Sequence, residues 1–388
     1  MDKHYTPRQQ NIVVICHKYT SGPDDDLVRY LNDRLFLNVL HIRHSFSSLK
    51  DRRSYCTWYR EGKVFKEYKT ADYRILPEPL LYLKELIFSV WWILRSGLVV
   101  DKYIGLDGLC ALFGQLLKTV SGRIKQSIFW AIDFVPTRRF EGDLKNWVYS
   151  WINWMGYKNS DQMWDLGPKM AQAREDFLGI KVTDYRLHRV VPYGAWLDHM
   201  PKYTYDECEK NTLVYMGHIH EKSGIQLVIE AIPEIVNRVP DFKFKIIGGG
   251  GYVDNLIDLA RVLNVSSYCN FLGKIDDIRV VETEIAKSAL AIAPYVSALD
   301  TFTRYADPGK VKTYLACGVP VLLTKVPWNA NEIQDNECGK IIAENKNDIA
   351  SSVVELLTSP SMNQQYRVNA LKYSMRFDYK NIFSFIAS

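Results

Sequence analysis

Hydrophobic residues recur along this chain in two periods, and each period predicts one kind of element. Residues 11–16 form a short, β-branched and almost wholly apolar run, which is typical of a buried parallel strand. Residues 80–98 instead place apolar side chains every three or four positions, as in a helix that buries one face. By the same criteria the first half adds strands at 127–132 and 189–194 and helices at 27–37 and 146–157, while residues 50–75 show no clear period.

The alternation is more regular in the second half. It predicts strands at 212–216, 242–247, 268–272, 289–293 and 319–323, with helices at 224–239, 252–263 and 308–317. Strands that alternate with helices form parallel sheets. We therefore predict an α/β fold of two doubly wound, Rossmann-like domains that face each other across a cleft. The charged, proline-containing residues 198–210 predict a linker between an N-terminal domain at 1–197 and a C-terminal domain at 211–375.

Composition and charge limit the classes of function. The chain has 388 residues, more than one hydrophobic core usually supports, and 47% of them are hydrophobic. A formal charge of +5 suits an anionic ligand or an acidic membrane surface and is too mild to indicate nucleic acid. The longest apolar run, residues 86–94, is too short to span a bilayer, and the polar N-terminus predicts no signal peptide. We expect a cytoplasmic protein, soluble or membrane-associated.

The seven cysteines indicate neither a zinc site nor a disulfide framework. They are odd in number, scattered, and never arranged as Cys-x-x-Cys. This pattern is typical of a protein from a reducing compartment.

Two loops carry candidate chemistry. Residues 217–224 follow a predicted strand, so they lie at the carboxyl edge of a parallel sheet, where ligands bind. Gly217 allows a ligand to approach the backbone, and Lys222 stands beside a helix N-terminus, which attracts anions. The alternative is an ordinary surface loop with a solvated lysine.

The second loop opens the helix predicted at 308–317. Asp307 is a suitable N-cap and Pro308 a suitable first helical residue, so the free amides of Gly309 and Lys310 would point at a ligand. Such a helix end holds a diphosphate well, and Lys310 adds charge-assisted hydrogen bonds. The alternative is a capped structural helix. At helical spacing Lys312 lies about 200° from Lys310, so we expect its replacement to do little.

In their order, these segments resemble the donor domain of GT-B glycosyltransferases of family 4, the glycosyl transferases group 1. The resemblance covers residues 211–345 and only loosely the N-terminal half, through Ser21-Gly22 and residues 191–194. Its motifs are Gly217 with Lys222-Ser223-Gly224, Gly248-Gly249-Gly250 after a strand, Asn270-Phe271-Leu272-Gly273, Gly318-Val319-Pro320-Val321, and Glu332.

The chain also departs from the family pattern. His218 stands where the family usually has an arginine, so a titratable group replaces a fixed charge. The family's paired glutamates are missing, because their positions fall near Tyr305 and at Thr313. By the resemblance, Lys310 takes part of the lost role.

The resemblance implies transfer of a sugar from a nucleotide diphosphate sugar to a hydroxyl of a glycan or lipid-linked glycan. Configuration would be retained, with no metal and no cofactor besides the co-substrate. Lys222, Lys310 and His218 would stabilise the departing diphosphate electrostatically. The donor-binding set would be Gly217, His218, Lys222, Gly248, Gly249, Pro308, Gly309, Lys310, Thr313 and Glu332. Two alternatives remain: a nucleotide-sugar epimerase of GT-B-like fold, and a catalytically silent nucleotide-sugar-binding protein.

The acceptor side is assigned to the N-terminal domain. Asp107 and Asp133 follow predicted strands and are candidate catalytic carboxylates, and turn or cap roles are their alternatives. Ser21, Gly22 and His17 follow the first strand and complete the acceptor-side set, although a lone histidine is more often structural. By resemblance to the family's final helix, residues 376–388 would cross back onto this domain.

Three further patterns are a tryptophan-bearing helix face, a glycine run and an Asp-x-Asp motif. Trp147, Trp151 and Trp154 share a helix face, which indicates either core packing or contact with a membrane or acceptor. The run 248–251 lacks the Gly-x-Gly-x-x-Gly spacing of a dinucleotide site. Residues 24–26 contain Asp-x-Asp, which some transferases use to bind metal, but a solvated loop is the favoured interpretation.

Overall fold

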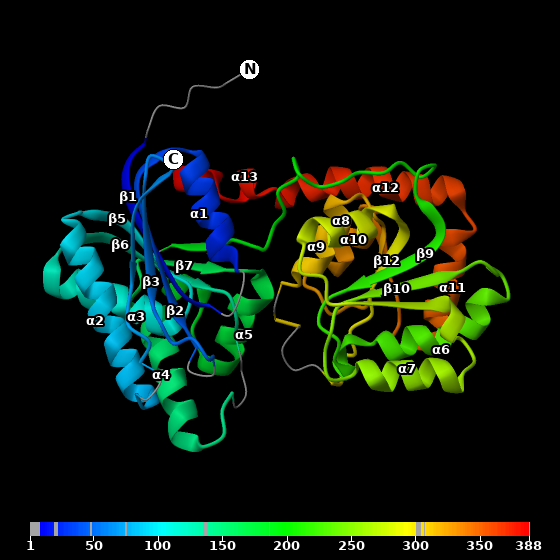
Figure 1. Ribbon diagram of the computed structural model, residues 1–388, viewed down its shortest axis with the longest axis horizontal. Coiled ribbons are helices and arrows are strands. Elements are labelled where there is room, and N and C mark those ends of the chain that lie inside the picture. Colours follow the sequence, from blue (N-terminus) through cyan, green and yellow to red (C-terminus); the bar gives the residue numbers. More distant parts are fainter. Residues whose placement is uncertain are drawn as a thin grey trace. The chain divides into compact units, whose positions relative to one another are not determined.

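The computed structural model describes residues 8–18, 22–46, 49–73, 76–134, 139–185, 187–299, 304–305 and 307–387 (Figure 1). It divides into two compact units, Met1–Val191 with Phe383–Ser388 and Pro192–Ile382. The division differs from the predicted linker at 198–210, because these residues belong to the second unit. There Tyr205 and Cys208 are buried in its core, so the segment is part of the folded unit.

The first unit is built on an eight-stranded sheet of order β4-β3-β2-β1-β5-β6-β7-β8. Its strands are β1 (Arg8–Lys18), β2 (Phe36–Ser45), β3 (Tyr55–Arg60), β4 (Lys63–Lys69), β5 (Val100–Gly105), β6 (Ile124–Ala131), β7 (Gln162–Asp165) and β8 (His188–Val190). The pairs from β2 through β1 to β8 are parallel, whereas β3 and β4 add an antiparallel hairpin. This hairpin, residues 55–69, lies in the stretch where the sequence showed no period, because β4 is an edge strand with mostly exposed residues.

Helices cover this sheet. They are α1 (Pro23–Asp33), α2 (Glu78–Ser96), α3 (Gly108–Ser121), α4 (Asp143–Asn159) and α5 (Pro168–Leu178). Trp92 of α2 and Phe113 of α3 pack with Ile15 and Tyr103 of the sheet in one hydrophobic cluster. In contrast, Trp147, Trp151 and Trp154 of α4 are exposed, so the core interpretation of these three residues was wrong.

The second unit has a six-stranded, wholly parallel sheet of order β11-β10-β9-β12-β13-β14. Its strands are β9 (Glu209–Met216), β10 (Lys243–Ile247), β11 (Cys269–Gly273), β12 (Ser288–Ala293), β13 (Val321–Leu323) and β14 (Gly339–Ile341). Its helices are α6 (Ile225–Val236), α7 (Val253–Val262), α8 (Ile278–Lys287), α9 (Gly309–Ala316), α10 (Ala330–Asp335), α11 (Lys346–Leu357), α12 (Pro360–Ser374) and the short α13 (Tyr379–Ile382).

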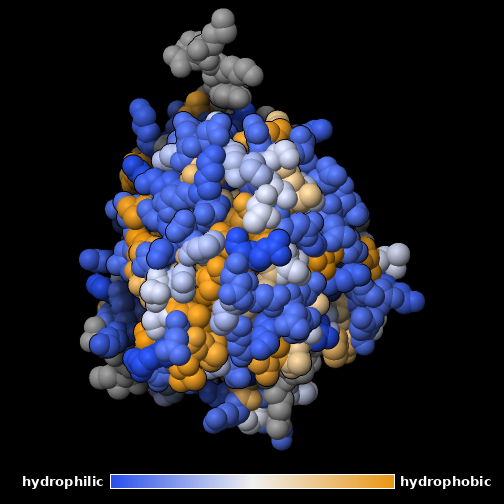
Figure 2. All heavy atoms as spheres, turned by 90° about the vertical axis from the view of Figure 1, so that its right-hand side faces the viewer, coloured by the Kyte–Doolittle hydropathy of each residue, from blue (hydrophilic) through white to orange (hydrophobic). Residues whose placement is uncertain are grey.

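Successive side chains of β9 point to opposite faces of this sheet, as its pleat requires. Leu213 and Tyr215 pack beneath α6, α7 and α11, whereas Val214 packs beneath α8, α9, α10 and α12. Both faces are therefore covered, as predicted for a doubly wound domain. Figure 2 looks onto one outer side of this unit, where hydrophilic residues predominate and hydrophobic ones appear in small groups. No helix among the described residues has the length and apolar content needed to cross a bilayer.

The end of the chain packs into the first unit. Phe383 is fully buried, and its ring lies 5.6 Å from that of Tyr30 and 5.8 Å from that of Trp130. The Lys102 ammonium donates a hydrogen bond to the carbonyl of Ile386 at 2.8 Å. The segment that groups with the first unit begins at Phe383, later than the predicted 376.

Phe383→Ala should therefore destabilise the first unit by about 3–5 kcal/mol, the usual cost of removing a buried aromatic ring. The measurement is urea unfolding followed by tryptophan fluorescence, since Trp130 touches the ring. Val120→Ala, at the exposed end of α3, is the control and should leave the midpoint unchanged. Equal midpoints for both variants would contradict the anchoring role of the chain end.

Candidate functional site

The loop after β9 carries the first part of the candidate donor site. Gly217 has a φ of 138°, and a Cβ there would lie 2.8 Å from the Lys310 ammonium. Its amide donates to the carbonyl of Ile247 at 2.9 Å, so the ends of β9 and β10 are joined. Any larger residue at 217 would adopt a disfavoured backbone conformation and displace Lys310. The lysine position thus depends on the glycine.

Lys310 is held by aromatic side chains. Its ammonium donates to the Tyr215 hydroxyl at 2.8 Å and lies 4.2 Å from the Tyr215 ring centroid and 5.1 Å from that of Tyr295. The Tyr215 hydroxyl in turn donates to the carbonyl of His218 at 3.0 Å. Among the described residues, no carboxylate pairs with Lys310. Its positive charge is therefore positioned without being neutralised, which favours binding of an anion.

The start of α9 differs from the prediction. The N-cap is Pro308, with no side-chain cap, and Asp307 is not the cap. The buried Asp307 carboxylate pairs with Lys312 and accepts hydrogen bonds from the Trp328 indole at 2.8 Å and the Tyr193 amide at 2.9 Å. Because no side chain among the described residues caps the helix start, the amides of Gly309 and Lys310 are available to a ligand.

A second tyrosine fixes α9 against β9. The Tyr314 hydroxyl, buried in the core, accepts a hydrogen bond from the Met216 amide at 2.7 Å. The first turn of α9 and the end of β9 are thus tied together at Tyr215 and Tyr314. Neither tyrosine was predicted as a site residue from the sequence, although both fall within predicted elements.

Lys222 lies in a short 3₁₀ turn, Glu221–Ser223, before α6. The carbonyl of Lys222 accepts the amide of Val296 at 3.0 Å, which fixes this loop to the segment after β12. His218 and His220 are exposed, with ring centroids 4.1 Å apart. Burial, His218 and Lys222 together lower the pKa of His220.

The remaining predicted donor residues lie after β10, within α9 and on α10. Gly248 and Gly249 follow β10, where the amide of Ile219 donates to the carbonyl of Gly249 at 3.0 Å, so they adjoin the Gly217 loop. Thr313 directs its hydroxyl to the carbonyl of Gly309 within α9, at 3.3 Å. Glu332 on α10 instead pairs with Arg376 and accepts from the Tyr373 hydroxyl, each at 2.9 Å. These contacts tie α10 to the end of α12 and the turn after it, and the predicted contact of Glu332 with the sugar stays a prediction.

In the first unit, His17 and Asp107 lie together as candidate acceptor-side residues. Asp107 caps α3 by accepting the Cys110 amide at 2.9 Å, and it lies 2.9 Å from Nδ1 of His17. Nε2 of the same ring lies 3.0 Å from the buried Glu85 of α2. Burial lowers the pKa of His17, but Asp107 and Glu85 outweigh it and raise that pKa to about 10. At neutral pH the ring is a cation, and the carboxylates of Asp107 and Glu85 at its two nitrogens neutralise that charge, so the contacts give His17 a structural role.

The other acceptor-side candidates that the structure describes make their contacts with residues other than His17 and Asp107. Asp133 forms an ion pair with Arg139 at 2.5 Å, and Arg139 also donates to the Tyr149 hydroxyl at 2.9 Å. Gly22 is the N-cap residue of α1. Ser21 lies outside the described residues.

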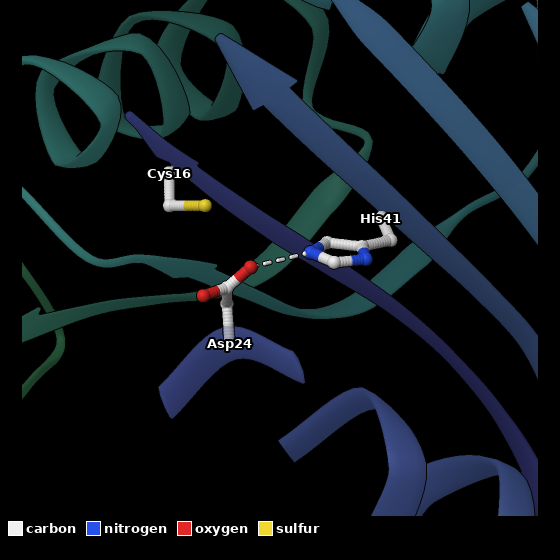
Figure 3. Close-up of side chains that lie close together, drawn as sticks. All are labelled: Cys16, Asp24 and His41. Carbon is white, nitrogen blue, oxygen red and sulfur yellow. Dashed lines mark hydrogen bonds and ion pairs between the residues drawn. The ribbon is translucent and has the colours of Figure 1, made fainter. Parts of the chain in front are cut away.

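Two groups of side chains in the first unit have the ligand types of a metal site. In Figure 3, Asp24 points toward His41, with Cys16 on the neighbouring strand. The second group is His17, Asp107 and Cys110; within each group the ligand atoms lie within 4.8 Å of one another. At Asp24, Lys18 lies 3.4 Å away and already supplies positive charge. Burial raises the pKa of Asp24, but His41 and Lys18 outweigh it and lower that pKa to about 2. The first group is thus a charge network that does not require an ion, and the prediction of no metal stays a prediction.

Comparisons with known sequences concern mainly the second unit. Residues 210–359 match the family model described as "Glycosyl transferases group 1". The D-inositol 3-phosphate glycosyltransferase 2 of Catenulispora acidiphila is 23% identical over 175 residues, 42% of this chain and 39% of that protein. The GDP-mannose-dependent alpha-(1-6)-phosphatidylinositol monomannoside mannosyltransferase of Mycolicibacterium smegmatis is 29% identical over 159 residues, 39% of this chain and 40% of that protein. The matches thus span about two fifths of these relatives' own length.

Similar solved structures extend over nearly the whole chain. Sucrose-phosphate synthase from Thermosynechococcus elongatus covers 97% of this chain and 98% of its own, with a TM-score of 0.71 at 13% identity. HepE from Anabaena, solved in complex with UDP, covers 97% of this chain and 98% of its own, with a TM-score of 0.70 at 13% identity. At this identity the likeness concerns the fold. It confirms the prediction of two Rossmann-like domains of GT-B type.

The buried Lys312–Asp307 pair changes one prediction. Lys312 was expected to be replaceable, but its side chain is fully buried against a buried carboxylate. Lys312→Ala should cost about 3–5 kcal/mol of unfolding free energy, because it leaves Asp307 without its counter-charge. Urea unfolding of Lys312→Ala and of the exposed control Lys372→Ala measures this difference. A Lys312 variant as stable as the control would contradict the pairing.

Proposed function

We propose that the protein is a hexosyltransferase, because residues 210–359 match the family model of the glycosyl transferases group 1. It transfers a sugar from a nucleotide diphosphate sugar to a hydroxyl of a glycan or lipid-linked glycan, with retention of configuration and without a metal. One observation carries the proposal: Tyr215 holds the Lys310 ammonium, which pairs with no described carboxylate, at the start of α9.

The diphosphate is assigned to the carboxyl edge of the second sheet. The amides of Gly309 and Lys310 lie at a helix N-terminus, which attracts an anion through its dipole and its free donors. The Lys310 ammonium adds a charge within the same turn. Lys222 is on the loop between β9 and α6, which ends at this same edge. Together these groups replace the charge neutralisation that a divalent cation would supply.

Catalysis then follows from differential stabilisation. As the bond between sugar and diphosphate breaks, negative charge accumulates on the departing phosphate oxygen, and a positioned ammonium binds that state more strongly than the intact donor. Tyr215 and Tyr295 hold the ammonium in place before the reaction, so little reorganisation is needed.

The proposed acceptor class rests on the relatives. The name of the Mycolicibacterium protein specifies a phosphatidylinositol monomannoside, and another relative, from Streptococcus pneumoniae, is named alpha-monoglucosyldiacylglycerol synthase. It is 26% identical over 178 residues, 43% of this chain and 37% of that protein. We extend a lipid-linked acceptor to this chain and assign its binding to the first unit.

Lys310→Ala and Lys222→Ala should each lower kcat/KM by at least about tenfold. Each removes a charge-assisted hydrogen bond worth about 1.5–3 kcal/mol, and about 1.4 kcal/mol corresponds to one decade in rate. Donor hydrolysis or transfer, measured over a panel of nucleotide diphosphate sugars, tests this with Lys372→Ala as the control. Equal effects from all three variants would contradict the assignment of the diphosphate to this edge. Donor binding with no turnover in the wild type would favour the catalytically silent alternative.

Activity should survive excess EDTA. The described contacts place Lys310 and the α9 amides, and no carboxylate pair, where the diphosphate is assigned. The initial rate with EDTA should match the untreated rate. A complete loss that Mn²⁺ or Mg²⁺ restores would contradict the electrostatic assignment.

A further inference from the structure

Helix α2 buries two charged side chains and exposes a stripe of apolar ones. Lys84 and Glu85, in the middle of the helix, are only 6% and 2% exposed. Lys84 donates to the carbonyl of Arg52 at 3.0 Å, and Glu85 binds His17. Its exposed large apolar side chains are Leu80, Leu83, Ile87, Trp91 and Leu94, which recur at helical spacing. A water-facing helix normally shows the opposite pattern.

Helix α4 also exposes a stripe of apolar side chains. Trp147, Trp151 and Trp154 are 64%, 44% and 42% exposed, and Leu144 and Val148 lie on the same stripe. The buried residues of α4 are only Gly156 and Tyr157. Elsewhere, in the second unit, exposed large apolar side chains such as Val262 and Val368 are isolated, which is normal for a protein surface.

The two stripes belong to one side of the first unit. The Lys145 ammonium of α4 lies 2.8 Å from the Glu78 carboxylate of α2, which joins the N-terminal ends of the helices. Figure 1 shows α2 and α4 near each other at the lower left, with α3 beside them. The ten exposed residues of the two stripes are termed the apolar helix face: Leu80, Leu83, Ile87, Trp91, Leu94, Leu144, Trp147, Val148, Trp151 and Trp154.

The charges around this face favour a lipid surface. On α2, no residue between Leu80 and Leu94 exposes a charge. Basic side chains flank the stripes: Arg95 ends α2 with its guanidinium 5.2 Å from the Trp91 ring, and Lys158 ends α4. Acidic groups occur at the N-terminal ends, where Glu78 is neutralised by Lys145 and Asp143 opens α4. Tryptophan side chains suit the boundary between acyl chains and headgroups, and flanking basic groups attract anionic headgroups.

We propose that the apolar helix face docks α2 and α4 onto the surface of an anionic bilayer. The tryptophan rings enter the headgroup region, while Arg95 and Lys158 stay in contact with lipid phosphates. The proposal does not depend on the donor site, because Lys222 and Lys310 belong to the other unit. It does place the unit to which we assign the acceptor at the surface where a lipid-linked acceptor resides.

Sedimentation with vesicles tests the docking. Wild type should sediment with phosphatidylcholine–phosphatidylglycerol vesicles, less with phosphatidylcholine alone, and less in high salt, which screens the charges. The variant with Trp147, Trp151 and Trp154 all replaced by serine should partition at least about tenfold more weakly, because three apolar rings no longer enter the lipid. Val262→Ser with Val368→Ser, in the second unit, is the matched control and should bind as wild type.

Folding and self-association are checked alongside. Because the three tryptophans are exposed, the serine variant should keep the wild-type melting curve; Ile87→Asp, on α2, provides an independent second variant with the same expected loss. Tryptophan emission should shift to the blue when wild type meets anionic vesicles. The proposal is overturned if both variants sediment as wild type, or if wild type is a dimer whose emission is unchanged by vesicles, which would assign the face to a second copy of the chain.

Discussion

The close approach of the loops at the carboxyl edge of the second sheet is the constraint on which the candidate site depends. Gly217 leaves the space that the Lys310 ammonium occupies, and the Gly217 amide joins β9 to β10. With that space filled, the ammonium could not reach the Tyr215 hydroxyl. The missing side chain at 217, the placed charge at 310 and the open amides of α9 are therefore parts of one arrangement.

Tyrosines, and not carboxylates, hold the Lys310 ammonium in place. Tyr215 and Tyr295 orient Lys310 through a hydroxyl and two ring faces, and they leave its charge for a ligand. On the same helix, Lys312 shows the contrast, because Asp307 neutralises it and both are buried. One lysine of α9 is thus structural and the other is free to bind, although they are only two residues apart.

The sequence predicted the strands of the second unit through β13 well, since β10, β12 and β13 are short, largely buried runs and β9 ends in one. It failed where the pattern is weak: β4 is an exposed edge strand, and its alternation does not reflect a buried face. At the site, the glycines and lysines were found because loops after parallel strands bind ligands. Tyr215, Tyr295 and the role of Asp307 were not, because they depend on contacts between segments distant in the chain. Likewise, helical spacing gave the angle between Lys310 and Lys312 but not which of them faces the core.

The central claim is that the start of α9 binds a diphosphate, and calorimetric titration tests it most directly. UDP and GDP are titrated into wild type and Lys310→Ala, together with the nucleoside of whichever one binds. The dissociation constant of that diphosphate should rise by at least about tenfold in the variant, as expected for loss of a charge-assisted hydrogen bond, while binding of the nucleoside stays unchanged. An equal affinity of both proteins for the diphosphate would contradict the account.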